Sequence, residues 1–312
     1  MSAEASHTRL ALLHLCDSLF PLGSFAHSDG LETVASSGAV VSGSDRTTHE
    51  VGRKARLELV FGFKNGKTVL THGYAEPPLR IGQCLEGQRG LHLIMASSAP
   101  GIFGGDEFEC NVRLETGAVA LLTSQSALQV HPSTSGVPAR IANRYEVAAG
   151  AELTCTWEPL IPFAGSRVIQ RFEVDVAEGG RVSWSDGLMS GRHGRGESWQ
   201  FACVDHELRV ARAGVLAFLE RYRITPHDDD ARSRWTVGDA GYIGTVVRAG
   251  HGDTLAVAEG IHRALAALEL VRGSADVLDS DLLLARMVAG DGVAFRRARR
   301  AVDSALEETV KS

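Results

Sequence analysis

Hydrophobic and polar residues alternate with a period of two from Lys54 to about Val210. The stretches 55–61 and 108–114 show the alternation most clearly, and it indicates strands with one buried face. Similar runs recur over 119–122, 151–157, 169–176, 182–184, 200–204 and 208–210. Glycine-containing turns such as 65–66 and 178–180 separate them, as in hairpins and tight connections. Many short strands at close spacing predict a mainly β fold, whether sandwich, barrel or stacked sheets.

The period changes to that of a helix after Thr254. Apolar residues then recur at helical spacing in two places: Leu255, Ala258, Ile261, Leu265 and Leu268, and later Phe295, Ala298, Val302 and Ala305. Each set forms one stripe on a helix surface, so we expect two C-terminal amphipathic helices. With no fixed-period repeat inside the β region, residues 49–312 are interpreted as one domain.

The N-terminal part of the chain follows a different pattern. Residues 9–20 are mostly apolar and precede Pro21 and Gly23, which predicts one helix and a turn. Residues 36–49 are rich in Ser, Gly and Thr and hold few bulky apolar groups. Such a stretch buries too little surface to offset the cost of ordering, so we place a linker and a domain boundary there.

Composition narrows the class of protein. The chain has 312 residues, 44% of them hydrophobic, which suits a soluble globular domain. Its formal net charge of -6 gives no positive field for a phosphate backbone, so nucleic acid is not an expected partner. Five widely spaced cysteines without a CxxC pair favour neither a disulfide framework nor a zinc site. Without a signal-peptide pattern or a long apolar span, we expect a cytoplasmic protein that does not enter membranes.

Common catalytic motifs are absent from the sequence. Residues 62–68 end like a P-loop but have only three residues between the glycines, so we interpret Asn65-Gly66 as a hairpin turn. GxGxxG, GxSxG and HExxH do not occur. Residues 227–230 (HDDD) are expected to form a solvated loop, and the four arginines within 296–300 to pair with Asp303, Glu307 and Glu308 on the same helix.

Between Pro100 and Trp199, many polar residues occur within or next to otherwise apolar strands and turns. Four of them are carboxylates next to glycine or proline: Asp106, Glu158, Asp186 and Glu197. Burying a charge is costly unless partners or water are present. Two interpretations stay open, because these residues either pair internally or line a wet interior passage.

Five segments between residues 78 and 197, in this order, resemble the urease accessory protein family UreD, also called UreH. They are 78–80 (PLR), 100–106 (PGIFGGD), 122–127 (LTSQSA), 158–167 (EPLIPFAGSR) and 190–197 (SGRHGRGE). Residues 281–288 (DLLLARMV) resemble the C-terminal region of that family, so the resemblance covers about residues 50–312. Residues 12–40 separately resemble the opening of UreF. Residues 1–48 are too few to bury a helical core, so we interpret them as a UreF-like remnant and linker without an independent fold.

The resemblance implies a stacked, helical-like arrangement of short strands in one elongated domain. It also implies a non-catalytic scaffold that joins UreF and the GTPase UreG on apo-urease and supports GTP-dependent insertion of nickel. The GTP chemistry would belong to UreG, and the C-terminal helices would either dock UreF or simply pack in the core. No tightly bound cofactor is expected, only Ni²⁺ in transit.

A metal in transit needs weak, sequential ligands rather than a tight cage. We therefore hypothesise transient nickel contacts at Asp106, Glu158, Asp186, Glu197 and His131, with Thr123, Ser124, Gln125 and Arg192 as further polar residues of the passage or of the framework. The competing interpretation makes Asp106 a turn former and Arg192–Glu197 an internal ion pair.

Two other functions remain open at this point. An oxygen-ligated, metal-dependent hydrolase on a β scaffold would use the same carboxylates as ligands and His131 as a base. A purely structural protein would join UreF to urease while the metal passes elsewhere. The hydrolase predicts turnover by the isolated chain, whereas the structural protein predicts that only interface residues matter.

Overall fold

The computed structural model describes residues 52–87, 90–226, 240–279 and 281–308. The expected N-terminal remnant, 1–48, and the expected solvated loop, 227–230, lie outside the described residues.

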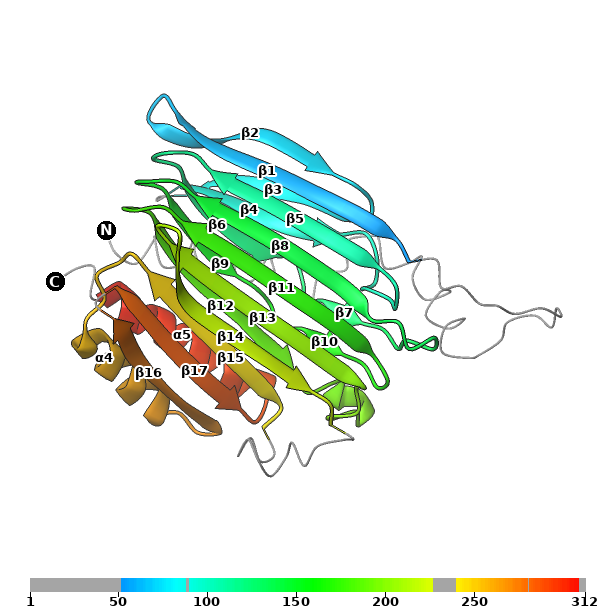
Figure 1. The fold of residues 1–312 in the computed structure, drawn as a ribbon. Coiled ribbons are helices and arrows are strands. Elements are labelled where there is room, and N and C mark those ends of the chain that lie inside the picture. The colour runs from blue at the N-terminus through cyan, green and yellow to red at the C-terminus, as the bar shows by residue number, and fades with distance from the viewer. Residues whose placement is uncertain (1–51, 88–89, 227–239, 280, 309–312) are drawn as a thin grey trace.

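Two large sheets stack against each other (Figure 1). The seven-stranded sheet has the order β14-β13-β11-β8-β5-β1-β2, and the eight-stranded sheet has the order β16-β17-β15-β12-β9-β6-β4-β3. The strands of the first are β14 (Val215–Ile224), β13 (Cys203–Arg212), β11 (Arg167–Val176), β8 (Ala139–Val147), β5 (Glu107–Leu114), β1 (Lys54–Lys64) and β2 (Lys67–Ala75). Those of the second are β16 (Val271–Asp279), β17 (Leu282–Ala289), β15 (Tyr242–Ala249), β12 (Arg181–Met189), β9 (Glu152–Thr156), β6 (Val119–Ser124), β4 (Gly90–Ser97) and β3 (Leu79–Gly87).

The chain winds between the two sheets like a solenoid. From β4 to β13 it alternates from one large sheet to the other, so each turn adds one strand to each sheet. Neighbouring strands in the middle of both sheets are therefore parallel, whereas the outer pairs such as β1–β2 and β13–β14 are antiparallel hairpins. The small sheet of β7 (Gln129–Val130) and β10 (Ile161–Pro162) joins two of the connections. This β-solenoid-like stack confirms the expected mainly β, stacked fold.

The apolar side chains on the inward faces of the strands fill the space between the two sheets. Leu57, Leu59 and Phe61 of β1 are fully buried. At the centre, the Trp184 ring lies 5.1 Å from the ring of Phe172 and 5.3 Å from that of Tyr145, which belong to the opposite sheet. Fully burying a side chain of this size stabilises the fold by about 1.5–3 kcal/mol, so these interdigitating rings hold the sheets together.

Two helices cover part of the other face of the eight-stranded sheet, α4 (Leu255–Ala266) and α5 (Gly292–Glu308) (Figure 1). Their buried residues form a second core with Leu283, Ala285 and Met287 of β17. Asp291 caps α5, because its Oδ1 accepts the backbone N–H groups of Val293 and Ala294. Both expected C-terminal helices are therefore confirmed. Neither combines the length and the apolar character needed to traverse a lipid bilayer.

Strands continue beyond Val210, where we had expected the β region to end. The hairpin of β16 and β17 lies between the two helices in sequence. Most residues of β17 are buried, and β15 is similar, because one face packs on the other sheet and the opposite face on the helices. A strand buried on both faces loses the alternation that reveals a half-buried strand.

The turn at Asn65 and Gly66 joins β1 to β2 in an antiparallel hairpin. Both residues have positive φ, 53° and 80°. Two central residues with positive φ are typical of the tight hairpin turn that Asn-Gly favours, so the hairpin interpretation is confirmed.

Candidate functional site

The predicted site residues fall into three groups. Asp106 belongs to the first, at the end of the molecule where the chain crosses from the eight-stranded to the seven-stranded sheet. Its side chain is 3% exposed. Oδ1 accepts the backbone N–H of Arg53 at 2.8 Å, and Oδ2 accepts that of Phe103 at 3.0 Å. These bonds fasten the β4–β5 connection to the start of β1, as a turn-forming carboxylate does.

His131 lies between two aromatic rings in the same group. Its ring stacks on that of Phe103 with centroids 4.2 Å apart, and it meets the edge of Phe163 at 4.8 Å. The guanidinium of Arg192 covers the Phe163 ring at 3.8 Å. A continuous row of rings and charges therefore links neighbouring connections at this end of the solenoid.

Arg192 and Glu197 form the expected internal ion pair. Both oxygens of the carboxylate accept from the guanidinium, and Oε2 also accepts the backbone N–H of Ala164 at 3.1 Å. The hydrogen bond from Arg192 is the main reason that the pKa of Glu197 is lowered, and the Ala164 bond acts in the same direction. Glu197 thus holds two connections together.

The second group lies where β6 and β9 end. Thr123 Oγ1 is 2.8 Å from His92 Nε2, and Ser124 Oγ accepts the backbone N–H of Glu158 at 3.0 Å. Gln125 is exposed. The Glu158 side chain is 49% exposed and lies 3.9 Å from the Arg299 guanidinium. This group is therefore open to solvent.

Arg299 corrects part of the expectation for the basic cluster on the last helix. We expected pairing within the helix, but Arg299 of α5 points to Glu158, which follows β9. Its side chain is only 11% exposed, and it also lies over Phe295 at 5.9 Å. The apolar stripe that docks α5 on the sheet brings Arg299 inward with it.

Asp186 belongs to the third group, which lies between the sheets. Its Oδ2 accepts the indole N–H of Trp184 at 3.0 Å and is 3.8 Å from His206 Nε2. His206, on β13 of the opposite sheet, is 3% exposed and stacks on Tyr222 at 4.7 Å. The same Nε2 is 3.9 Å from Glu220 Oε2 of β14. An imidazole is thus placed between two carboxylates.

Glu220 connects this group to two further strands. Its Oε1 accepts from Arg286 of β17 at 2.8 Å and from Thr245 of β15 at 3.3 Å. Its Oε2 and both ring nitrogens of His206 make no hydrogen bond with the described residues. Buried polar atoms without a protein partner are rare in folded proteins and mark sites where function or a small polar ligand has to be considered.

Burial moves the pKa values in this group in opposite directions. It raises the pKa of Asp186 to about 6 and lowers that of His206 to about 4. The pKa of Glu220 is also raised, first by burial and then by the charge of Asp186. Burial is the largest cause of each of these pKa shifts, since it disfavours whichever form of the group is charged. At neutral pH the imidazole is therefore neutral beside two carboxylates.

His206, Glu220, Thr245 and Arg286 were missed by sequence reasoning. The sequence pattern does mark His206 as a buried position. It lies two residues from both Val204 and Leu208, so it is on the core-facing side of its strand. The same holds for Glu220 beside Phe218. The sequence gives no sign that these strands meet Asp186.

Within the described ranges, no three histidines, cysteines or carboxylates are grouped as the ligands of one metal ion. The five predicted contacts are distributed over the three groups instead. Residues spaced in this way do not form a tight cage for one metal ion.

Sequence comparison supplies the family. The model of the UreD urease accessory protein family matches residues 53–312. A urease accessory protein UreD from Sorangium cellulosum is 34% identical over 56% of this chain and 55% of its own length. The UreD protein from Anaeromyxobacter sp. is 29% identical over 78% of this chain and 78% of its own length. The UreD protein from Ralstonia nicotianae is 30% identical over 76% of this chain and 82% of its own length.

The family match begins at residue 53, one residue before β1, and ends at residue 312, so it covers both large sheets and both helices. The chain belongs to the UreD urease accessory protein family.

Proposed function

We propose that this chain is a non-catalytic scaffold for the maturation of urease, which joins UreF and UreG on apo-urease while nickel is inserted. The observation that carries the proposal is the family match over residues 53–312. UreG would supply the GTPase activity. The proposed setting is the cytoplasm, where a thiol such as that of the exposed Cys84 stays reduced.

The positions of the carboxylates support a nickel path of weak, separate contacts. Glu158 is open to solvent, and Asp186 lies deeper, between the sheets. Asp106 and Glu197 are already engaged with backbone N–H groups. We therefore propose Glu158 and Asp186 as transient nickel contacts, with Asp106 and Glu197 mainly shaping the connections around them. His131, packed between rings, belongs to that framework and is the weaker candidate.

The test separates nickel transit from assembly. Asp186→Asn and Glu158→Gln keep the shape of each side chain and remove its charge. We expect both variants to co-purify with UreF, UreG and apo-urease while urease activation falls, because neutral amides are poorer ligands for a divalent cation. Glu173→Gln, on the exposed face of β11, is the matched control.

Normal activation by every variant with intact assembly would remove these residues from a nickel path and leave a purely structural scaffold. Loss of co-purification in the variants would instead assign the carboxylates to assembly. The scaffold proposal itself would be overturned if cells that lack the chain matured fully nickel-loaded urease.

The hydrolase alternative gains no support. The family match favours an accessory protein, and the described residues hold no compact group of metal ligands. Substrate turnover by the isolated chain would be the result that restores it.

A further inference from the structure

The pairing of β9 with β12 is interrupted just after β9 by a bulge that consists of Glu158 and Pro159. The backbone N–H of the residue before the bulge donates to the carbonyl of Ser185 at 2.8 Å, and that of the residue after it donates to Gly187 at 2.9 Å. Only Asp186 of β12 lies between these two bonds. Two residues of one strand therefore lie opposite one residue of the other, as in a β-bulge.

At this bulge, the two proposed nickel contacts lie on opposite sides of the eight-stranded sheet. Gly187 faces α5, since a Cβ there would lie 2.9 Å from the Phe295 ring. Because neighbouring residues of a strand point to opposite faces, Asp186 points into the space between the sheets. Glu158 instead reaches Arg299 of α5 on the helix side. A metal ion that moved from one carboxylate to the other would therefore cross the sheet at the bulge.

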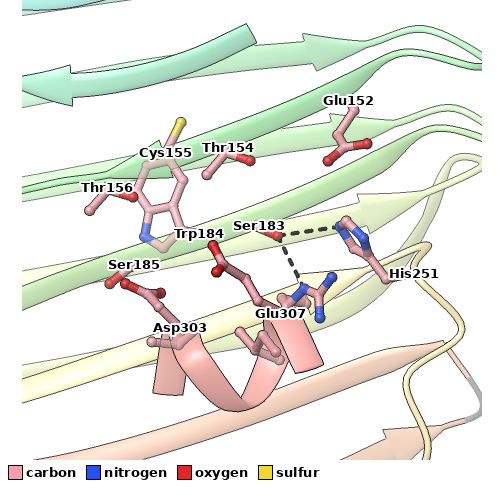
Figure 2. A pocket seen from close by; sticks show the side chains of 13 residues that line it. Glu152, Thr154, Cys155, Thr156, Ser183, Trp184, Ser185, His251, Asp303 and Glu307 are labelled. Atoms are coloured by element: carbon pink, nitrogen blue, oxygen red, sulfur yellow. Dashed lines mark hydrogen bonds between the residues drawn. The ribbon is translucent and has the colours of Figure 1, made fainter. Parts of the chain in front are cut away.

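The docked helix places Arg299 over this bulge. About one turn further along α5, Asp303 lines the pocket shown in Figure 2 together with Ser185, which lies just before the bulge. About one turn earlier, Phe295 lies against Gly187, just after the bulge. Arg299 is midway between these two contacts of the helix, so it lies opposite the bulge itself.

Arg299 is a nearly buried cation that is paired only loosely with Glu158. Its side chain is 11% exposed, and its guanidinium lies 3.9 Å from Glu158 Oε1, which is too long for a hydrogen bond. Burial raises the pKa of Asp186, whereas the hydrogen bond from Trp184 and the charge of Arg299 lower it. The same guanidinium therefore acts on the carboxylates on both sides of the sheet.

We propose that Arg299 sets how tightly a divalent cation is held at Glu158 and Asp186, because it is the counter-cation that an arriving metal ion has to displace. This inference rests on the nickel path proposed above. A positive charge beside two carboxylates lowers their affinity for a second cation. The ion is then released readily, as passage through successive sites requires. Arg299 has no lone pair to offer a metal, so it acts through the two carboxylates as a positioning residue.

Two substitutions separate the charge of Arg299 from its packing. Arg299→Met keeps a long side chain beside Phe295 without the charge, and Arg299→Lys keeps the charge. In calorimetric titrations of the full chain with nickel chloride, we expect Arg299→Met to bind nickel at least about tenfold more tightly than the parent. Arg299→Lys should bind like the parent. Arg300→Met, which removes an exposed charge from the same helix, is the matched control and should leave the affinity unchanged.

A double substitution locates the effect on nickel affinity. Adding Glu158→Gln to Arg299→Met should abolish the gain in affinity, because the carboxylate freed by the loss of Arg299 is then absent. In assays with UreF, UreG, apo-urease and limiting nickel, Arg299→Met should activate urease more slowly than the parent although the complex still co-purifies, since a more tightly held ion leaves more slowly. Unchanged thermal unfolding shows that the variants keep their fold.

The inference about Arg299 is overturned if Arg299→Met binds nickel like the parent, if Arg299→Lys gains as much affinity as Arg299→Met, or if the gain persists in the double variant. In each of these results the nickel path itself still stands, provided that Glu158→Gln and Asp186→Asn weaken nickel binding. If neither of those two substitutions changes nickel binding or urease activation, the proposed path fails and the inference about Arg299 fails with it.

Discussion

At the residue scale, one buried site holds two groups that respond to pH in opposite ways. The pKa of Asp186 is raised from 3.8 to about 6, and that of His206 is lowered from 6.5 to about 4. Each change is worth about 3 kcal/mol between the two charge states. Because the side chains are at most 14% exposed, solvent screens little of this difference.

These directions fix the sign of each contribution to stability. Between about pH 4 and 6 the folded chain binds the Asp186 proton more tightly than the unfolded chain does, so this contribution falls as pH rises. For His206 the unfolded chain binds the proton more tightly, so its contribution falls as pH drops from 6.5 to about 4. The two nearly cancel in the parent protein.

Single substitutions of these two residues should therefore change the pH dependence of the free energy of unfolding in opposite directions. We expect the stability of Asp186→Asn to rise more steeply with pH than that of the parent, and the stability of His206→Gln to fall as pH rises, each by up to about 3 kcal/mol across this window. Urea unfolding at intervals from pH 4 to 6.5 measures both slopes. Equal slopes in the two variants would show that burial does not shift these groups oppositely.

At the element scale, two glycines let α5 approach the sheet. A Cβ at Gly244 of β15 would lie 2.7 Å from the Phe295 ring, and a Cβ at Gly187 of β12 would lie 2.9 Å from it. The Phe295 side chain is 2% exposed and stacks on Tyr242 at 5.2 Å. The absence of side chains at these two glycines thus makes room for Phe295, which fixes α5 on the sheet. The docked helix also places Arg299 near Glu158.

We expect Gly244→Ala to destabilise the chain by about 1–3 kcal/mol, because the added methyl group forces Phe295 out of its position. Gly260→Ala is the matched control, since a Cβ there meets nothing within 4 Å. In the middle of α4 that change should be neutral or stabilise by about 0.5–1 kcal/mol. Urea unfolding compares the variants, and equal effects would refute the close approach. Combining Gly244→Ala with Phe295→Leu should recover part of the loss.

At the scale of the whole molecule, the chain has two hydrophobic cores. One lies between the sheets, and the other lies between the eight-stranded sheet and the helices. β17 contributes to both, with Leu282 on one face and Leu283 on the other. The inter-sheet core does not include α4 and α5, so we expect the helix layer to open while the two sheets stay packed.

Ile261→Ala and Leu153→Ala test this division, because each removes a fully buried side chain from one core. Both should cost about 2–5 kcal/mol. We expect Ile261→Ala to speed hydrogen exchange in α4, α5 and β16 while β5 and β8 stay protected, and Leu153→Ala to speed exchange across both sheets. Uniform loss of protection in both variants would mean that the molecule opens as one unit.

The sequence by itself determined the local structure wherever one face of an element meets water. The alternation over 55–61 and 108–114 became strands, and Asn65-Gly66 became a turn. The helical stripes over 255–268 and 295–305 became α4 and α5, although α4 ends at Ala266, before the last residue of its stripe. In each case the pattern of burial has the period of the element itself. The ordered UreD-like segments also identified the family.

Tertiary structure alone decided which strands meet. β15 and β17 are buried on both faces, so their period is hidden, and the joining of Asp186 with His206 and Glu220 depends on how the two sheets stack. The same holds for Arg299, which faces Glu158 because α5 docks on the sheet. Periodicity shows which face of an element is buried, whereas contacts between residues far apart in sequence depend on how those faces pack together.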